Sequence, residues 1–396
     1  MWRKNKLLKD KNLYYVGGVV RDEILGAASF DTDFCYEGDA IEFAKKQGLR
    51  IVKENSDFGT VRVVAQDIGT PHPQPLTSQK MLNGSHFLRQ SHKGRGELCA
   101  EIDIASTREE EYPKAGHLPV VKNLGCPLKD DLKRRDFTIN AMAKNTLTNE
   151  IVDYFGGMDD IRNKKLRVLH SQSFIDDPTR IVRALKFSVR FGFALDEETK
   201  KLQNEYLSNI NYDMSYHRLK KELKETFSLN KEEAYKKFIN DGIYKLLSND
   251  VISSKLAEGV CAKLVEKYNP ANPWLVWLGN FDLSNLELTA EEKNIIDSVP
   301  DVKPKSDFEL YKLFKDLPLE SILLYALHVD YNLALHYLDD LKNIRIETSG
   351  NDLKSMGFKQ GKIYKEIFDL LLEEKIRNPH LTKQDEIQLI RGKYGI

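Results

Sequence analysis

The stretch at residues 16–33, VGGVVRDEILGAASFDTD, decides the fold of the N-terminal part of the chain. The run just before it, residues 13–16, is apolar and rich in strand-forming side chains, which is typical of a strand. Gly17 and Gly18 allow the backbone to approach a polyphosphate, and Arg21 adds a charged fork that fits phosphate oxygens. A Gly-Gly pair before a helix, taken alone, is more often an ordinary turn.

Two aspartates follow this turn at i, i+2 spacing, Asp31 and Asp33. In a strand over residues 30–36 they project from the same face. Two carboxylates on one strand can share a pair of Mg²⁺ ions, and two metal ions suit phosphoryl or nucleotidyl transfer. An isolated Asp-x-Asp pair is usually a solvated strand edge or loop. Together with the glycine-arginine turn, it indicates nucleotide chemistry.

Composition limits the remaining possibilities. The 396 residues are enough for two to four domains, and the 60 basic residues equal the 60 acidic ones. Phosphate binding must therefore come from local patches rather than from a global positive field. The four cysteines form no C-x-x-C pair, which argues against a zinc knuckle or a disulfide framework. Without an apolar signal core or a membrane-length apolar run, we expect a soluble, cytoplasmic protein.

The sequence pattern changes near residue 150. Residues 1–150 predict an α+β head, a small mixed sheet with helices, and the remainder predicts an all-α neck (151–228), body and tail (229–396). In the head, strands are expected at 14–19, 30–36, 50–53, 59–66 and 98–106, with a helix at 40–47. Farther along, apolar residues at i, i+3 and i+4 predict helices at 179–191, 216–227, 231–239 and 363–374.

Residues 70–96 differ from their surroundings because they contain no acidic residue, where about four would be expected from the composition. The segment holds three of the nine histidines and three prolines. We interpret it as an inserted, largely disordered hairpin tip. An RNA-contacting basic loop is the sharper alternative. A histidine metal site is disfavoured by the irregular spacing.

A third carboxylate follows in Glu101-Ile102-Asp103-Ile104. Alternation along a strand places Asp103 on the face opposite Ile102 and Ile104, which are expected to be core residues. In that position it borders a cleft. Without Asp31 and Asp33 nearby, it would be interpreted as an ordinary exposed strand residue.

Two further segments concentrate polar side chains within one helical turn each. In residues 130–141, DDLKRRDFTINA, a pair of arginines, an aspartate and an asparagine are able to grip a triphosphate and ribose hydroxyls. An amphipathic helix start would explain only the apolar positions. In DDPTRIVR, from Asp176, the simplest interpretation is a helix capped by Asp177 with an i, i+3 ion pair to Arg180.

Together, these segments resemble the class II tRNA nucleotidyltransferases and bacterial poly(A) polymerases, within the polymerase β-like nucleotidyltransferases. GGVVRD with DTD is similar to the family's metal motif, RRDFTINA to its ribose and triphosphate motif, DYFGGMDDIRNKKLR to its hinge motif, and DDPTRIVRALKF to its base-reading motif. The four motifs occur in the family's order. The resemblance continues through SYHRLKKEL and SGNDLKSMGFKQGKIY and covers nearly the whole chain.

The resemblance implies that Asp31 and Asp33 bind two Mg²⁺ ions and that Asp103 is the third catalytic carboxylate. It implies a hinge around Asp153, Gly156 and Gly157. The nucleotide-binding residues that it implies are Gly17, Gly18, Arg21, Arg135, Asp136, Asn140, Asp177, Arg180 and Arg183. The chain departs from the family pattern at Lys186, where an arginine is usual, and at Asp176, where many relatives have glutamate.

The base-reading role can be examined by its chemistry. Cytosine and adenine both present an amino donor beside a ring-nitrogen acceptor on the Watson–Crick edge, which complements the carboxylate of Asp177 and the guanidinium of Arg180. Uracil and guanine reverse this order and would leave a buried polar group unpaired, at a cost of about 1–3 kcal/mol. One pocket could therefore select C and A.

The resemblance implies template-independent addition of C and/or A from CTP and ATP to the 3′ end of tRNA, with release of pyrophosphate. The helical part would bind tRNA by shape and phosphate contacts. The candidate contacts are Arg190, Lys200, Lys201, Arg218, Lys220, Lys221 and Lys224.

Other activities remain open. A poly(A) polymerase usually carries a Gly-Arg-Arg-Phe-like segment where this chain has Asp57-Phe58-Gly59-Thr60. A CC-only enzyme tends to lack a flexible loop, for which residues 107–129 leave room. An A-adding-only enzyme is an alternative that the sequence leaves open. A non-catalytic RNA-binding protein is the remote alternative.

Overall fold

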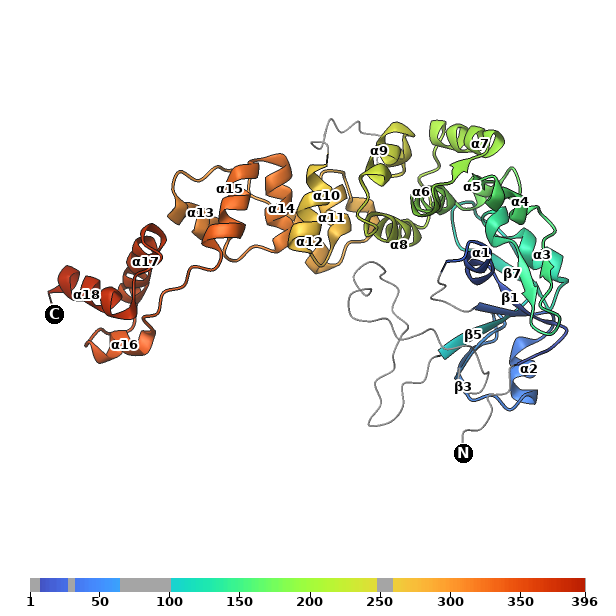
Figure 1. Cartoon of the computed structure of the whole chain (residues 1–396), viewed down its shortest axis with the longest axis horizontal. Helices are drawn as coiled ribbons and strands as arrows, with labels where there is room; N and C mark the ends of the chain where they lie inside the picture. Colours follow the sequence, from blue (N-terminus) through green and yellow to red (C-terminus); the bar gives the residue numbers. More distant parts are fainter. Residues whose placement is uncertain (1–7, 28–32, 65–100, 248–258, 396) are drawn as a thin grey trace. The chain divides into compact units, whose positions relative to one another are not determined.

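The computed structural model describes residues 8–27, 33–64, 101–247 and 259–395. Asp31 and the 70–96 segment lie outside these residues. The chain divides into two compact units, residues 1–251 with 284–287, and residues 252–283 with 288–396 (Figure 1).

A mixed sheet forms the centre of the first unit, as the sequence predicts. Its strands in the described residues are β1 (Leu13–Val16), β2 (Asp33–Tyr36), β3 (Ile51–Asn55), β4 (Thr60–Val64), β5 (Glu101–Ser106), β8 (Ala143–Asn145) and β9 (Ile151–Val152). They lie in the order β3-β4-β5-β2-β1-β8-β9, and only β2 and β5 pair in parallel. The predicted pairing of the strands that flank the 70–96 segment is confirmed as β4 against β5.

The first expected strand is shorter than predicted. Residues 17–19 do not continue β1, because Gly17 has a φ of +71° and α1 (Gly18–Ile24) begins directly after it. A positive φ is compatible with glycine and interrupts the extended backbone of a strand. The chain therefore turns sharply at the motif that the sequence singles out.

Two apolar clusters cover the sheet. One contains Phe34 and Ile104, with Phe43 of α2 (Ala40–Lys46). The other contains Cys35 of β2 with Leu132 of α3 (Leu128–Lys133). Phe34 and Cys35 are consecutive, so the two clusters lie on opposite faces of the sheet.

Within the segment 107–129, residues 108–124 form an ordered hairpin rather than an irregular loop. Its strands are β6 (Arg108–Glu111) and β7 (Val120–Leu124), which pair in antiparallel fashion. A single 3₁₀ turn, η3 (Thr138–Asn140), follows α3. α3 and η3 both contain residues of the motif at 130–141.

The rest of the first unit is mainly helical, as predicted. Its elements are α4 (Gly157–Arg162), α5 (Ser173–Asp176), α6 (Thr179–Phe191), α7 (Glu197–Ser208), α8 (Tyr216–Phe227), α9 (Glu232–Asn240) and the turns η4 (Ile243–Leu246) and η5 (Ser284–Leu286). A short parallel pair, β10 (Lys165–Leu166) and β11 (Ala194–Leu195), joins them.

All regular elements in the described residues of the second unit are helices. It contains α10 (Val260–Tyr268), α11 (Pro273–Leu278), α12 (Ala290–Asp297), α13 (Asp307–Phe314), α14 (Leu319–His328), α15 (Tyr331–His336), η6 (Tyr337–Leu341), α16 (Gly350–Ser355), α17 (Lys362–Arg377) and α18 (Lys383–Tyr394). None of the helices in the described part of the chain combines the length and apolar character needed to cross a membrane.

Candidate active site

Two carboxylates lie side by side where β2 begins. The parallel register places Asp33 opposite Asp103 of β5, and both residues are exposed. Asp103 alternates with the buried Ile102 and Ile104, as expected from the sequence. We call Asp33 and Asp103 the carboxylate pair.

Arg62 is the residue of this region that the sequence analysis missed. It lies opposite Asp103 in the β4–β5 register, and its Nε and Nη2 each donate a hydrogen bond of 2.8 Å to the Asp103 carboxylate. These bonds and the negative charge of Asp103 raise the pKa of Arg62. The available signal was the position of Arg62 between two buried valines of β4, on the same face as Asp103.

Carboxylate oxygens are the hard ligands that Mg²⁺ prefers, so the carboxylate pair fits a divalent cation. Among the residues that the structure describes, no further His, Cys, Asp or Glu completes a group of three metal ligands. Asp31, the expected second residue of the Asp-x-Asp pair, lies outside the described residues. Its contribution to such a site is a prediction.

Gly17 and Arg135 lie close together, and we call these two residues the cradle. A Cβ atom on Gly17 would lie 2.9 Å from Nη1 of Arg135, so a larger residue would displace the arginine. The Nη2 of Arg135 donates to Asp131 at 3.0 Å, while its Nε is buried and, among the described residues, has no hydrogen-bond partner. A buried donor without an acceptor is costly unless a ligand supplies one.

Arg21 is buried, and its guanidinium faces the protein rather than solvent. Its Nε and Nη2 donate to Asp22, and its Nη1 donates to Oδ1 of Asn140 at 2.6 Å. The guanidinium carbon lies 4.7 Å from the ring centre of Phe191. Burial lowers the pKa of Arg21, although Asp22 opposes this effect. Arg21 thus joins the glycine turn, where Gly18 lies beside its Nη2, to Asn140 of the RRDFTINA motif.

The Asn140 amide continues this network into the neck. Its Nδ2 donates to Asp136 at 2.9 Å, and Nε and Nη2 of Arg183 donate to the same carboxylate at 2.8 and 2.7 Å. Arg183 also donates to Glu222 of α8 at 3.0 Å. Burial alone would raise the pKa of Asp136, but Arg183 and Asn140 lower it to about 2. The pKa of Arg183 is raised, because Asp136 and Glu222 outweigh its burial.

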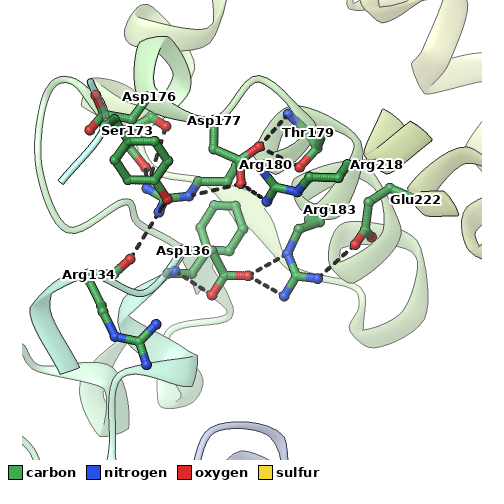
Figure 2. A network of polar contacts seen from close by, with 12 residues as sticks. Arg134, Asp136, Ser173, Asp176, Asp177, Thr179, Arg180, Arg183, Arg218 and Glu222 are labelled. Carbon is green, nitrogen blue, oxygen red and sulfur yellow. Dashed lines mark hydrogen bonds and ion pairs between the residues drawn. The ribbon is translucent and has the colours of Figure 1, made fainter. Parts of the chain in front are cut away.

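Asp177 and Arg180, which we call the base-reading pair, are both buried at the start of α6 (Figure 2). Oδ1 of Asp177 accepts from the backbone N and the hydroxyl of Thr179, at 3.1 and 2.6 Å. Nη1 of Arg180 donates to the Ser173 hydroxyl at 2.7 Å, and Nη2 donates to the Arg134 carbonyl at 3.0 Å. The two side chains are 3.9 Å apart, so the expected ion pair is loose.

The guanidinium of Arg218 contacts Asp177, whereas a side chain that binds tRNA is expected to face solvent. Its Nη2 donates to Oδ2 of Asp177, and its Nη1 is buried with no hydrogen-bond partner among the described residues. The sequence predicted an amphipathic helix over residues 216–227 that contains Arg218. This pattern does not specify which residue Arg218 contacts. Arg218 therefore belongs to the base-reading region (Figure 2).

The other basic candidates differ in their surroundings. Nη2 of Arg190 lies 3.7 Å from Asp22, and Lys220 donates to the Glu287 carbonyl at 3.1 Å. Lys200 and Lys201 line a surface depression of α7, and Lys221 and Lys224 are exposed on α8. Lys186, at the position of the family's arginine, donates to Glu222 and Glu225 at 2.6 Å each. Asp176 is partly buried, and burial raises its pKa.

The hinge motif is tightly packed in this structure. The Asp153 carboxylate accepts from the backbone N of Gly157 at 2.9 Å and of Met158 at 2.8 Å, at the start of α4. A Cβ on Gly157 would lie 2.3 Å from the Thr138 carbonyl, so only glycine fits there. Gly156 has a φ of +77°. Movement of the head about this motif is a prediction.

Comparisons with known proteins extend over nearly the whole chain. Residues 13–167 match the Poly A polymerase head domain family. The A-adding tRNA nucleotidyltransferase of Halalkalibacterium halodurans is 27% identical over 96% of this chain and 88% of its own length. That of Aquifex aeolicus is 29% identical over 91% of this chain, which spans only 44% of that longer protein.

A solved complex of a CCA-adding enzyme with ATP has the same fold. It superposes with a TM-score of 0.72 at 25% identity, covering 97% of this chain and 90% of the other. The head-domain match and the fold shared along the chain agree with the four motifs in their order. Residues 13–167 thus belong to the Poly A polymerase head domain family, and the chain resembles the class II tRNA nucleotidyltransferases over nearly its whole length.

Proposed function

We propose that this protein adds C and/or A from CTP and ATP to the 3′ end of tRNA without a nucleic acid template and releases pyrophosphate. The observation that carries the proposal is the cradle of Gly17 and Arg135, where a buried guanidinium donor has no acceptor of its own among the described residues. A triphosphate oxygen is the acceptor that this donor fits. The same unit of the chain contains the carboxylate pair and the base-reading pair.

Nucleotidyltransferases of this family are generally dependent on divalent metal ions. We propose Mg²⁺ as the ion, held by Asp33 and Asp103 together with Asp31. When bound, the ions would activate the 3′-hydroxyl and stabilise the charge of the leaving pyrophosphate. Arg62 donates one hydrogen bond to each oxygen of Asp103 and so holds this carboxylate in place, while a further lone pair on each oxygen would serve the metal ion.

Selection of the base is assigned to the base-reading pair. Asp177 offers an acceptor and Arg180 a donor, the pattern complementary to cytosine and adenine. The hydrogen bonds to Thr179, Ser173 and the Arg134 carbonyl fix both side chains before any nucleotide binds. A base edge has to take the place of some of these partners. The contacts that remain hold the two side chains in place and lower the ordering cost of binding.

The relatives favour tRNA as the acceptor. Their names include A-adding tRNA nucleotidyltransferase and multifunctional CCA protein, and solved neighbours include complexes with ATP, CTP and a tRNA. We propose that the helical neck, body and tail bind tRNA. Among the described residues, Cys35 and Cys126 are free thiols, which supports our proposal of a location in the reducing cytoplasm.

One experiment separates the possible activities. Purified protein is incubated with tRNA transcripts that end before CCA, after C and after CC, each with labelled CTP or ATP. Incorporation of both nucleotides in order supports CCA addition, and incorporation of ATP only after CC indicates an A-adding enzyme. Long A tracts on any RNA indicate a poly(A) polymerase. Absence of incorporation on all three transcripts contradicts the proposal.

A further inference from the structure

Arg134 and Arg135 are consecutive cations of the RRDFTINA motif, and both bond to one buried carboxylate, that of Asp131. The side chain of Asp131 is 0% exposed, whereas each of the two arginine side chains is 18% exposed. Asp131 lies on α3, whose Leu128 and Leu132 belong to the apolar cluster on one face of the sheet. The carboxylate is therefore carried by a helix that the core holds in place.

The two oxygens of the Asp131 carboxylate accept unequal numbers of hydrogen bonds. Oδ1 accepts from Nε and Nη2 of Arg134 at 3.0 and 2.7 Å and from the backbone N of Arg108 at 3.2 Å. Oδ2 accepts from Nη2 of Arg135 at 3.0 Å. Burial alone would raise the pKa of Asp131, but Arg135 and Arg134 lower it. The carboxylate is thus ionised at neutral pH, and its bonds to both arginines are charge-assisted.

The two arginines differ in the donors that they have left for a ligand. Arg134 also donates from Nη1 to Glu110 at 3.0 Å, so each of its three guanidinium nitrogens has an acceptor. Arg135 donates from Nη2, while its buried Nε has no acceptor among the described residues. Its Nη1 would lie 2.9 Å from a Cβ atom on Gly17. Of the two cations, Arg135 is therefore the one that can take a phosphate oxygen without losing a bond.

The bond from Asp131 has a consequence for the energetics of ligand binding. An arginine side chain without a partner samples many rotamers, and ordering it when a ligand binds costs conformational entropy. Asp131 orders the Arg135 guanidinium before any ligand binds, and it also balances the positive charge of the neighbouring Arg134. Because Asp131 is buried behind the two arginines, it acts on a ligand through Arg135 and not by contact.

We propose that Asp131 is a positioning residue for the triphosphate, which holds Arg135 in the cradle and leaves its Nε and Nη1 to donate to phosphate oxygens. The inference rests on the proposed function and deepens it. A triphosphate oxygen supplies the acceptor that the buried Nε lacks. Loss of the Asp131 charge should therefore weaken the binding of phosphate groups and leave the selection of the base unchanged.

The test is a double-mutant cycle of Asp131→Asn and Arg135→Lys in the full-length chain. Asp131→Asn keeps the shape of the side chain and removes its charge. The Kd values of CTP and of inorganic triphosphate are measured by titration calorimetry with Mg²⁺ present, and inorganic triphosphate isolates phosphate binding because it has no base. Asp130→Asn is the matched control, since Asp130 is the neighbouring, exposed carboxylate of the same helix.

For Asp131→Asn we expect both Kd values to rise by roughly five- to twentyfold, because the charge-assisted bond that orders Arg135 is lost. The double variant should bind no more weakly than Arg135→Lys alone, since residues that act through one contact are not additive. In incorporation assays the KM for CTP should rise more than kcat falls, and the ratio of C and A to U and G should stay at the wild-type value. Asp130→Asn should match the wild type throughout.

The inference is overturned if Asp131→Asn keeps the wild-type Kd values, if it lowers only the melting temperature, or if its effect adds to that of Arg135→Lys. If Asp131→Asn does not fold, the cycle is run with Asp131→Glu, which keeps the charge and displaces the carboxylate by one methylene. Failure of both variants to fold would show a role in folding and would also overturn the inference. Wild-type protein that binds CTP but adds no nucleotide to tRNA contradicts the proposed function instead, and the Kd values then judge Asp131 by themselves.

Discussion

The carboxylate pair and the base-reading pair carry similar charged groups in opposite surroundings. The side chain of Asp103 is 49% exposed, whereas that of Asp177 is 5% exposed and surrounded by donors. A hydrated cation needs ligands that it can reach from solvent, while discrimination between bases needs polar groups that are buried and held. Substitutions in the first region should therefore remove chemistry alone. Substitutions in the second should affect stability as well.

The largest effect is expected for Asp33→Ala and likewise for Asp31→Ala. Loss of either ligand should lower nucleotide incorporation by roughly a thousandfold or more, because the charge of the transferred phosphate is then not stabilised. The melting temperature and tRNA affinity should stay nearly unchanged, since surface substitutions usually alter stability little. The check is incorporation of labelled CTP and ATP together with thermal unfolding.

Glu54→Ala is the control for that measurement, because Glu54 is an exposed carboxylate of the same sheet that pairs with Lys45. It should retain full activity. Wild-type rates in the Asp33→Ala variant would show that Asp33 is not a metal ligand. The two regions would then not differ in the way described above.

At Asp136, which is buried between Arg183 and Asn140, we expect a substitution to lower stability. Its folded-state pKa of about 2 lies below the ordinary value of 3.8, so the native state favours the ionised form. This contributes about 2 kcal/mol to the free energy of unfolding above pH 4, and the contribution is lost as the pH falls from 4 towards 2. Urea unfolding at several pH values measures it.

Asp136→Asn should be less stable than the wild type at pH 7 and should lose part of the acid dependence between pH 4 and 2. An unchanged pH profile in this variant would show that other carboxylates cause the acid dependence. The buried network around Asp136 would then contribute as little to the free energy of unfolding as the exposed carboxylates do.

An intermediate effect is expected for Asp177→Ala, which removes the acceptor of the base-reading pair. Discrimination of C and A against U and G should fall by roughly tenfold, since an unpaired polar group in a buried site costs about 1–3 kcal/mol. Triphosphate binding should weaken less. The measurement is the ratio of the four nucleotides incorporated. A lower melting temperature with an unchanged ratio would limit Asp177 to capping α6 through Thr179.

The smallest effect is expected for deletion of residues 71–94. The β4–β5 pairing that presents Asp103 would close over a shorter connection, and the loop-closure term changes by only about 1 kcal/mol. Activity and melting temperature should stay close to wild type. A large loss of tRNA-dependent rate at preserved stability would show that the segment contacts RNA. A marked drop in melting temperature would show that it packs against the head.

Local patterns in the sequence located several of the elements and their buried faces. The alternation of Ile102, Asp103 and Ile104 predicted which side of β5 is buried, and helical spacing located α6 and α8. These patterns succeed because a strand or helix repeats over a few residues and buries one face. The prediction of a strand through residues 17–19 was wrong, since the positive φ of Gly17 is a property of one residue and not of a pattern.

By itself, the sequence determined the α+β head, the helical remainder and the residues that carry charge in each motif. Only the tertiary structure decided their partners. Arg62 and Asp103, like Asp177 and Arg218, are 41 residues apart, and Arg21 and Asn140 are 119 apart. No local periodicity connects such positions, because their proximity depends on strand register and on helix packing. Hence the tertiary structure alone placed Arg62 on the third carboxylate and Arg218 on the base-reading pair.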